Sequence, residues 1–169
     1  FQEEYNNSNH PIISYPQQLS GQPNRPSRSF QEVKYQCDTL PLEMNEKGDW
    51  VDLRAAQDMK LREGCSYYIP LGISVELPEG YEAHVAPRSS TFKNWGIIQT
   101  NSVGVIDNSY CGDNDIWMMP VYATRFTEIK KNDRVCQFRI VEKQPHLEFE
   151  TVDHLGNDDR GGFGITGRN

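Results

Sequence analysis

Arg134-Val-Cys-Gln-Phe-Arg-Ile-Val141 is a stretch rich in β-branched and aromatic residues. Such residues favour an extended strand, because their side chains pack well on a pleated surface. Ile116-Trp-Met-Met-Pro-Val-Tyr-Ala123 and Tyr81-Glu-Ala-His-Val-Ala86 carry the same signal. The polar run Lys130-Lys-Asn-Asp133 directly precedes the first stretch and predicts a reversal of the chain. The sequence therefore predicts that strands, rather than helices, form this fold.

Shorter strand signals precede these three, separated by turn residues such as Leu77-Pro-Glu-Gly80. They are Glu32–Cys37, Tyr67–Pro70 and Gly72–Glu76. Only Ser89 to about Asn94 predicts a helix, a short one with serine placed to cap it. Many short strands with almost no helical period predict an all-β fold, a sandwich or jelly roll.

The composition divides the chain into three parts. Residues 1–30 are rich in Asn, Gln, Ser and Pro, which predicts an extended arm, although Ile12, Ile13 and Tyr15 would also suit docking on a partner. Residues 31–155 are expected to form one β domain. Residues 156–169 are too rich in glycine for a strand and are expected to form a mobile tail.

The charge balance limits the classes of partner. Seventeen basic and 24 acidic residues give a net charge of -7, which disfavours nucleic acid as a partner. A phosphate-bearing ligand would need a local cluster of arginines, backbone N–H groups and a divalent cation. No apolar run approaches the roughly 18 residues of a membrane span, and no signal peptide is apparent, so a cytoplasmic protein is expected.

Pro87-Arg-Ser-Ser-Thr91 lies where a strand is expected to end and a helical turn to begin. Exposed N–H groups and the Arg88 guanidinium would hold phosphate oxygens there. The alternative is an ordinary helix cap with a surface arginine.

Thr100–Gly112 has the pattern of a β-hairpin, with an apolar centre between polar ends. Asp107 follows the apolar Val-Ile pair and has two interpretations. It is either a turn former, since Asp-Asn is a good turn pair, or a general base that activates water.

Arg134 and Gln137 are three residues apart on an expected strand, so their side chains should point to opposite faces. The two side chains could then not both serve one flat site on a single chain. Two sites or two subunits would be needed. An edge-strand arginine in a surface ion pair is the alternative.

Arg160-Gly-Gly-Phe-Gly-Ile-Thr-Gly167 combines flexible backbone with one aromatic ring. Glycine lets the backbone approach a ligand closely, and Phe163 has no evident core to enter. The segment is either a lid over a ligand or a disordered end.

Taken in order, these segments resemble the five motifs of the trimeric dUTPase family, of the bacterial and phage type. The motifs match Trp50–Ala56, Pro87–Ser90, Asn101–Asp107 with Tyr110 and Gly112, Arg134–Gln137, and the Gly-Gly-Phe-Gly tail. The resemblance covers about Gln31 to Gly167. It implies a dUTPase-like jelly roll, or β-clip, that assembles as a homotrimer with active sites shared between subunits and closed by the tail.

The resemblance also implies the chemistry, which is hydrolysis of dUTP to dUMP and pyrophosphate. Asp107 would activate the water that attacks the α-phosphorus, and Ser89 would contact the α–β bridging oxygen. The phosphates would be held by Arg88, Ser90, Arg134, Gln137, Arg160 and Thr166. Mg²⁺ would bind through the phosphates and water rather than directly through protein side chains, with at most an indirect contact from Asp52.

The hairpin from Asn101 to Tyr110 would select the nucleoside. Asn101 and the backbone around Val105 and Ile106 would pair with uracil, Tyr110 would exclude a 2′-hydroxyl, and Phe163 would stack on the base. Such an enzyme limits dUTP and supplies dUMP for thymidylate synthesis.

The motifs depart from the family pattern in three places. Asp49-Trp-Val precedes Asp52 where the family has Ala-Gly-aromatic, and Ser90 replaces a glycine. The tail lacks two residues between Arg160 and its Gly-Gly-Phe core, which implies a different path for that arginine.

Two other functions remain open. A dCTP deaminase has a similar outline but needs a glutamate in the pocket, and none stands between Lys93 and Glu128. A dUTPase-like trimer could instead act mainly as a regulatory module that binds a protein partner through the N-terminal arm.

Overall fold

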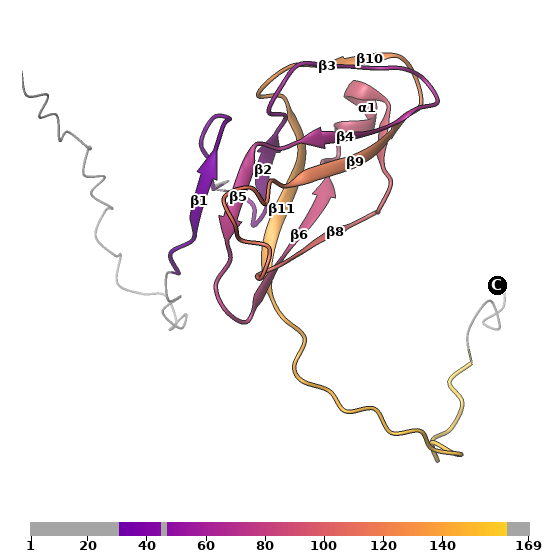
Figure 1. Ribbon diagram of the computed structural model, residues 1–169. Coiled ribbons are helices and arrows are strands. Elements are labelled where there is room, and N and C mark those ends of the chain that lie inside the picture. The colour runs from indigo at the N-terminus through magenta and orange to yellow at the C-terminus, as the bar shows by residue number, and fades with distance from the viewer. Residues whose placement is uncertain (1–30, 45–46, 162–169) are drawn as a thin grey trace, which may run out of the picture. The chain divides into compact units, whose positions relative to one another are not determined.

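Antiparallel strands make up nearly all the regular structure of the computed structural model, which describes residues 31–44 and 47–161 (Figure 1). The predicted N-terminal arm and the residues Phe163 and Thr166 lie outside the described residues, and so do the predictions made for them. The all-β prediction is confirmed.

Eleven strands and one short helix form the described part of the chain. In chain order the elements are β1 (Lys34–Cys37), β2 (Val51–Arg54), β3 (Met59–Leu61), β4 (Ser66–Pro70), β5 (Ile73–Glu76), β6 (Tyr81–Pro87), α1 (Thr91–Trp95), β7 (Ile97–Gln99), β8 (Gly104–Asp107), β9 (Met118–Ala123), β10 (Thr127–Ile129) and β11 (Arg134–Glu142).

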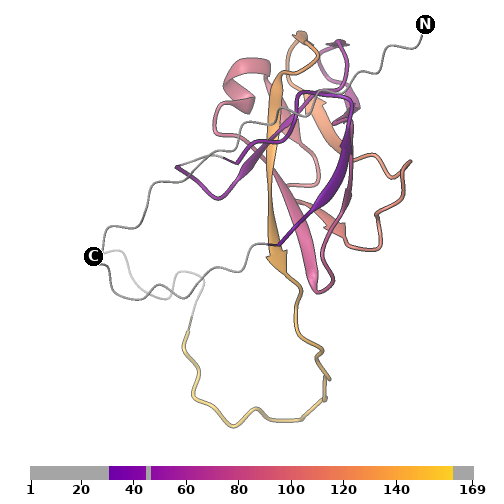
Figure 2. The same ribbon diagram turned by 90° about the vertical axis from the view of Figure 1, so that its left-hand side faces the viewer.

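Two sheets contain most of these strands. The larger has the order β2-β11-β6-β8, and the smaller has the order β4-β9-β7. The pairs β1-β5 and β10-β3 complete the set. Figure 2 shows β11 and β6 running side by side, and their ladder pairs seven residues, from Cys136 opposite Pro87 to Glu142 opposite Tyr81.

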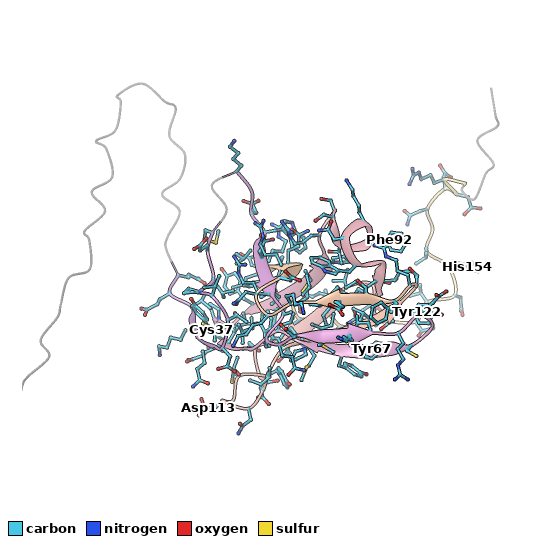
Figure 3. All side chains as sticks on the ribbon, turned by 90° about the horizontal axis from the view of Figure 1, so that it is seen from above. Cys37, Tyr67, Phe92, Asp113, Tyr122 and His154 are labelled. Carbon is cyan, nitrogen blue, oxygen red and sulfur yellow. The ribbon has the colours of Figure 1, made fainter. Side chains whose placement is uncertain are left out.

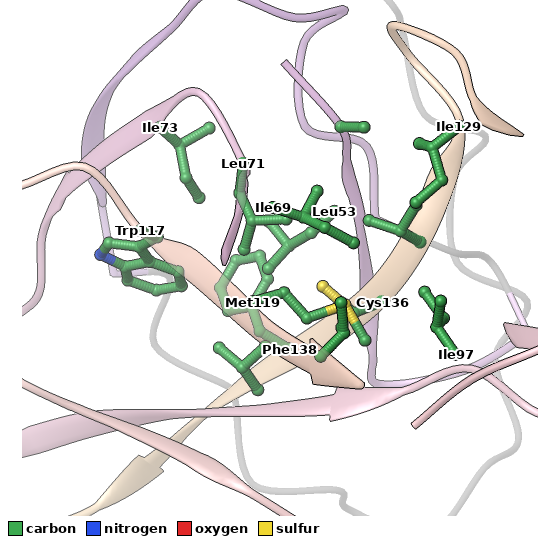
Figure 4. Close-up of a cluster of buried hydrophobic side chains, with 14 of the residues drawn as sticks. Leu53, Ile69, Leu71, Ile73, Ile97, Trp117, Met119, Ile129, Cys136 and Phe138 are labelled. Carbon is green, nitrogen blue, oxygen red and sulfur yellow. The ribbon is translucent and has the colours of Figure 1, made fainter. Parts of the chain in front are cut away.

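The core lies between the two sheets and is apolar (Figure 4). Leu53 of β2 and Phe138 of β11 contribute from the larger sheet, and Ile69 of β4 and Met119 of β9 from the smaller one. Trp117 packs edge-on against Phe138, with the ring centroids 5.3 Å apart. This contact joins the two segments Ile116–Ala123 and Arg134–Val141, whose apolar residues are buried in the core.

Every longer strand expected from the sequence is present, with ends that differ by one or two residues. The two reversals, Leu77–Gly80 and Lys130–Asp133, are confirmed as the connections into β6 and β11. The sequence signal did not reveal β2, β3, β7 or β10. These strands have three or four residues each, too few for alternation to stand out.

The expected hairpin between Thr100 and Gly112 is corrected by the structure. The segment contributes one strand, β8, which pairs with β6 instead of folding back on itself. Gly104 is opposite Val85 in this ladder, and a Cβ at Gly104 would lie only 3.3 Å from the Asn101 amide and 3.4 Å from the Val85 side chain. The close approach of β8 to β6 therefore limits residue 104 to a small side chain.

The smaller sheet has an exposed apolar outer face, hereafter the outer β9 face. Tyr68, Ile98, Met118 and Tyr122 occupy it, and each is at least 40% exposed. The ladder registers place Pro70 opposite Met118 and Ile98 opposite Tyr122, so these side chains share one side of the sheet. Figure 3 labels Tyr122 of this face. A contiguous apolar face of this kind is typical of an interaction surface.

Two further features concern the chemical setting. Cys37, Cys65, Cys111 and Cys136 are free thiols, and only the last is buried. In the part of the chain that the structure describes, no helix has the length and apolar character needed to cross a bilayer.

Replacing Leu53 with alanine tests the core. Leu53 is fully buried, so Leu53→Ala should lower the free energy of unfolding by about 2–5 kcal/mol through lost burial and a cavity. Urea denaturation at one fixed protein concentration measures the change. Leu40→Ala is the control, because the 52% exposed Leu40 should cost less than about 0.5 kcal/mol. Equal losses for the two variants would show that the core is wrongly assigned.

Candidate active site

Asp52 and two arginines form a charged cluster at one end of the larger sheet. Asp52 Oδ1 lies 2.6 Å from Arg88 Nε, and its Oδ2 accepts a hydrogen bond of 3.2 Å from Arg134 Nη1. The side chains of Arg88 and Asp52 are less than a third exposed, whereas Arg134 is 53% exposed. One carboxylate thus aligns two guanidinium groups, which leaves donors of both groups available to an anion.

Thr91 sets the backbone position of Arg88. The Thr91 side chain is buried, and its Oγ1 accepts the Arg88 N–H at 2.8 Å while donating to the Val135 carbonyl at 2.9 Å. This hydroxyl joins the Arg88 turn to β11, so it fixes the start of the predicted phosphate-binding segment against the sheet.

A bulge in β11 overturns the expectation that Arg134 and Gln137 point to opposite faces. The register with β2 shifts between Arg134 and Cys136, so that Arg134 is opposite Arg54 and Gln137 is opposite Asp52. Arg54 and Asp52 are two apart on β2 and share a face, so Arg134 and Gln137 share it as well. One extra residue thus brings both predicted phosphate ligands to the same surface.

The serines of this segment lie beside the arginine cluster. Ser89 is exposed and Ser90 is half-buried at the N-cap of α1. The expected serine cap is not formed, because Ser90 makes no side-chain capping bond and the helix begins at Thr91, two residues later than predicted. The hydroxyl of Ser90 is therefore not committed to the helix.

Asp107 ends β8 and is held at both carboxylate oxygens. Oδ1 accepts the Ser109 N–H at 2.8 Å, and Oδ2 lies 2.7 Å from Lys143 Nζ. The Lys143 ammonium and the hydrogen bonds from Ser109 lower the pKa of Asp107 from 3.8 to about 2. The carboxylate is therefore ionised at neutral pH, and it remains 53% exposed and open to water.

The other residues predicted for nucleoside binding lie along β8 and its loops. Asn101 accepts a hydrogen bond from buried Gln99 at 2.9 Å, which orients its amide. Val105 is exposed and Ile106 is half-buried. Tyr110 is 41% exposed and donates its hydroxyl proton to the Ile116 carbonyl at 3.3 Å.

The predicted base, Asp107, and the arginine cluster lie at opposite ends of β6. Asp107 is opposite Glu82 near the start of the strand, whereas Arg88 follows its last residue. Six residues of extended chain span about 20 Å. The proposed base and the arginine cluster of one chain are therefore too far apart to act on the same phosphate.

The cavity beside the arginine cluster is small and polar. It has a volume of about 260 Å³ and is lined by Pro41, Glu43, Met44, Asp52, Arg54 and Arg134. Nucleotide-sized ligand pockets typically measure about 300–1,000 Å³, so the cavity matches only part of a nucleotide. Among residues 31–44 and 47–161, no group of three or more His, Cys, Asp or Glu side chains is arranged to hold a metal ion.

The tail contributes one residue to the described structure. Arg160 is exposed and lies in irregular chain after β11. Nothing among the described contacts brings it to either group of site residues.

Two solved structures share this fold. A dUTPase of Staphylococcus bacteriophage 80alpha with dUPNHPP has a TM-score of 0.67 at 17% identity, over 82% of this chain and 99% of that one. A mutant dUTPase of phage phi11 of S. aureus, reported with a structural Mg(II) ion, has a TM-score of 0.63 at 16% identity, over 74% and 99%. The chain is thus an all-β protein with the fold of the phage dUTPases.

Sequence comparison narrows this class to a family. The dUTPase family model matches residues 48–167. A prophage-derived deoxyuridine 5′-triphosphate nucleotidohydrolase of Bacillus subtilis is 58% identical over 137 residues, which is 80% of this chain and 96% of that protein. The enzyme of the same name from Finegoldia magna is 40% identical, over 69% and 83%. The chain belongs to the dUTPase family.

Sequence reasoning missed three residues that organise the site. Thr91 supports Arg88, Gln99 orients Asn101, and Lys143 contacts Asp107. Thr91 and Gln99 lie within three residues of the side chains they support, but each is itself held by a bond to a more distant carbonyl, that of Val135 or Val85, and none of the three has a motif of its own. Lys143 is 36 residues from Asp107 in the sequence.

Removing the Thr91 hydroxyl tests its positioning role. Thr91→Val keeps the side-chain shape but leaves the Arg88 N–H and the Val135 carbonyl without their partner, which should cost about 1–3 kcal/mol of stability. Urea denaturation and the amide NMR shift of Arg88 report the effect. Thr151→Val, at an exposed position, should change neither. A stable variant with an unshifted Arg88 amide would contradict the role.

Proposed function

We propose that the chain hydrolyses dUTP to dUMP and pyrophosphate in a Mg²⁺-dependent reaction, at sites shared between the subunits of a homotrimer. Membership of the dUTPase family over residues 48–167 supports the substrate. The proposal that subunits share each active site rests on one observation. The ionised Asp107 carboxylate and the arginine cluster lie at opposite ends of β6.

Asp107 is the proposed general base. Its ionised carboxylate orients a water molecule and takes its proton as the water oxygen attacks the α-phosphorus. The bond from that phosphorus to the α–β bridging oxygen breaks, and pyrophosphate leaves with the electron pair. Ser89 of another subunit, exposed beside the arginines, is proposed to donate to that oxygen.

The arginine cluster is the proposed phosphate site. Arg88 and Arg134 present guanidinium donors on the face that Gln137 shares, and Ser90 adds a free hydroxyl. Mg²⁺ supplies charge neutralisation on the phosphates when bound. Asp52 offers a hard oxygen ligand beside the 260 Å³ cavity. Its two ion pairs with Arg88 and Arg134 favour a contact with Mg²⁺ through water rather than a direct one.

Nucleoside selection is proposed to fall to β8 and its loops. The Asn101 amide and the backbone at Val105 and Ile106 pair with uracil, and Tyr110 stands against the sugar where a 2′-hydroxyl would lie. Unpaired polar groups would disfavour other bases. Phe163, Thr166 and Arg160 are proposed to close the site as part of the tail.

Self-assembly has two supporting observations. The outer β9 face leaves four large apolar side chains exposed. After β11, the apolar Leu147 and Phe149 alternate with Glu148 and Glu150 in exposed chain. This alternation is typical of a β-strand, but the segment pairs with no strand among the described residues. Both features favour burial against further copies. A regulatory partner bound by residues 1–30 stays a prediction that can coexist with hydrolysis.

Pyrophosphate release provides the central test. The protein with Mg²⁺ should release pyrophosphate from dUTP, and from UTP, dCTP and dTTP far more slowly. Asp107→Asn should reduce kcat by about 10²–10⁴-fold, because it removes the general base, while dUTP still binds. Asp153→Asn, an exposed acid in irregular chain, is the control. Unchanged turnover by Asp107→Asn would refute the assignment, and ammonia release from dCTP would favour a deaminase.

Mixing two inactive variants tests whether the site is shared. Asp107→Asn and Arg88→Ala each disable one half, so mixed trimers should regain sites in which the intact halves come from different copies. Random assembly of equal amounts should recover up to about a quarter of wild-type activity. Co-expression followed by turnover and mass measurements checks this. Activity that never exceeds that of the separate variants would show that each chain contains a whole site.

A further inference from the structure

Lys143 contacts the proposed base directly, although no dUTPase motif identified in this chain includes it. Its Nζ lies 2.7 Å from Asp107 Oδ2 and also bonds to Asn108 Oδ1. The Ser109 N–H holds the other carboxylate oxygen at 2.8 Å. Both oxygens of Asp107 are therefore fixed, so the carboxylate plane cannot turn freely.

The backbone of Lys143 is itself anchored. Lys143 directly follows β11, and its N–H donates to the Gly80 carbonyl at 2.8 Å. That bond extends the β11–β6 ladder by one step, into the turn before β6. The Lys143 side chain is 31% exposed and crosses toward the end of β8. Because the backbone is already anchored, only the side-chain entropy of the lysine is lost when it holds one geometry.

The surrounding charges create a need for this cation. Glu82 of β6 is directly opposite Asp107, and like charges in such a pair repel. His84, on the same face of β6, bonds to Glu82 at 2.7 Å. Arg139 of β11 is opposite His84, and Glu142 of β11 is next to Lys143 in sequence. Lys143 is the cation in contact with the Asp107 carboxylate.

We propose that Lys143 is a positioning residue that holds the Asp107 carboxylate in the orientation needed to align the attacking water. The inference rests on the proposed function of Asp107. A carboxylate offers about four lone-pair positions, and Lys143 and the N–H and hydroxyl of Ser109 together occupy at most three, so a position remains that can accept water. Lys143 acts through Asp107 and transfers no proton itself.

Three variants of the full-length protein test this role. Lys143→Met keeps the apolar stem and removes the charge, and Lys143→Arg keeps the charge. Lys130→Met removes a lysine of a different ion pair, that with Asp58, and serves as the control. We expect Lys143→Met to lower kcat by about 10–100-fold with little change in KM, since misalignment by about 1 Å has such an effect. Lys143→Arg should recover most of kcat, and Lys130→Met should match wild type.

The pH profile separates positioning from a general structural effect. Without the lysine, the pKa of Asp107 should rise from about 2 toward its ordinary value of 3.8, while the hydrogen bonds from Ser109 still lower it. Between pH 7 and pH 4, Lys143→Met should then lose a larger fraction of its kcat than wild type and Lys130→Met lose, with an extra loss of up to about 40%. Circular dichroism at pH 4 checks that each variant stays folded.

A carboxyl NMR titration of wild-type Asp107 needs neither a folded variant nor turnover. A midpoint well below 3.8 supports the contact, and a midpoint near 3.8 overturns it. Wild-type kcat in Lys143→Met would also overturn the proposal. If wild type fails to hydrolyse dUTP, the proposed function fails, while the titration still decides whether Lys143 holds Asp107.

Discussion

The ladder between β6 and β11 determines where both halves of the candidate site lie. Its seven pairs run from Cys136 opposite Pro87 to Glu142 opposite Tyr81. Arg88 follows one end of the ladder, and Lys143, which bonds to Asp107, follows the other. Because an extended chain cannot shorten without breaking its hydrogen bonds, the two halves stay apart within one chain. This separation makes a shared site the arrangement that the geometry supports.

Each end of the ladder solves a different electrostatic problem. At one end a single carboxylate, Asp52, aligns two guanidinium groups and limits their mutual repulsion. At the other end a single ammonium, Lys143, holds a carboxylate that faces Glu82. The chain as a whole carries a charge of -7, so the local arginine cluster, rather than net charge, would attract a triphosphate.

The sequence predicted the class of fold. It also predicted the site residues near each end of the ladder, such as Arg88 and Arg134 at one end and Asp107 at the other. Strands such as β6, β9 and β11 are long enough for their buried residues to show, and the five motifs identified the family confirmed by comparison. Strands of three residues, such as β3 and β7, left too little signal. The assignment of individual site residues remains a prediction, and Phe163 and Thr166 lie outside the described part of the chain.

By itself, the sequence determined the β architecture and the family, and it predicted which side chains would bind phosphate and uracil, because local patterns encode strands and motifs. Tertiary structure alone decided that Arg134 and Gln137 share a face, that β8 pairs with β6, and that Lys143 contacts Asp107. A bulge shifts every later side chain by one position, and it arises from pairing with a distant strand. Contacts between residues far apart in sequence depend on packing that no local pattern contains.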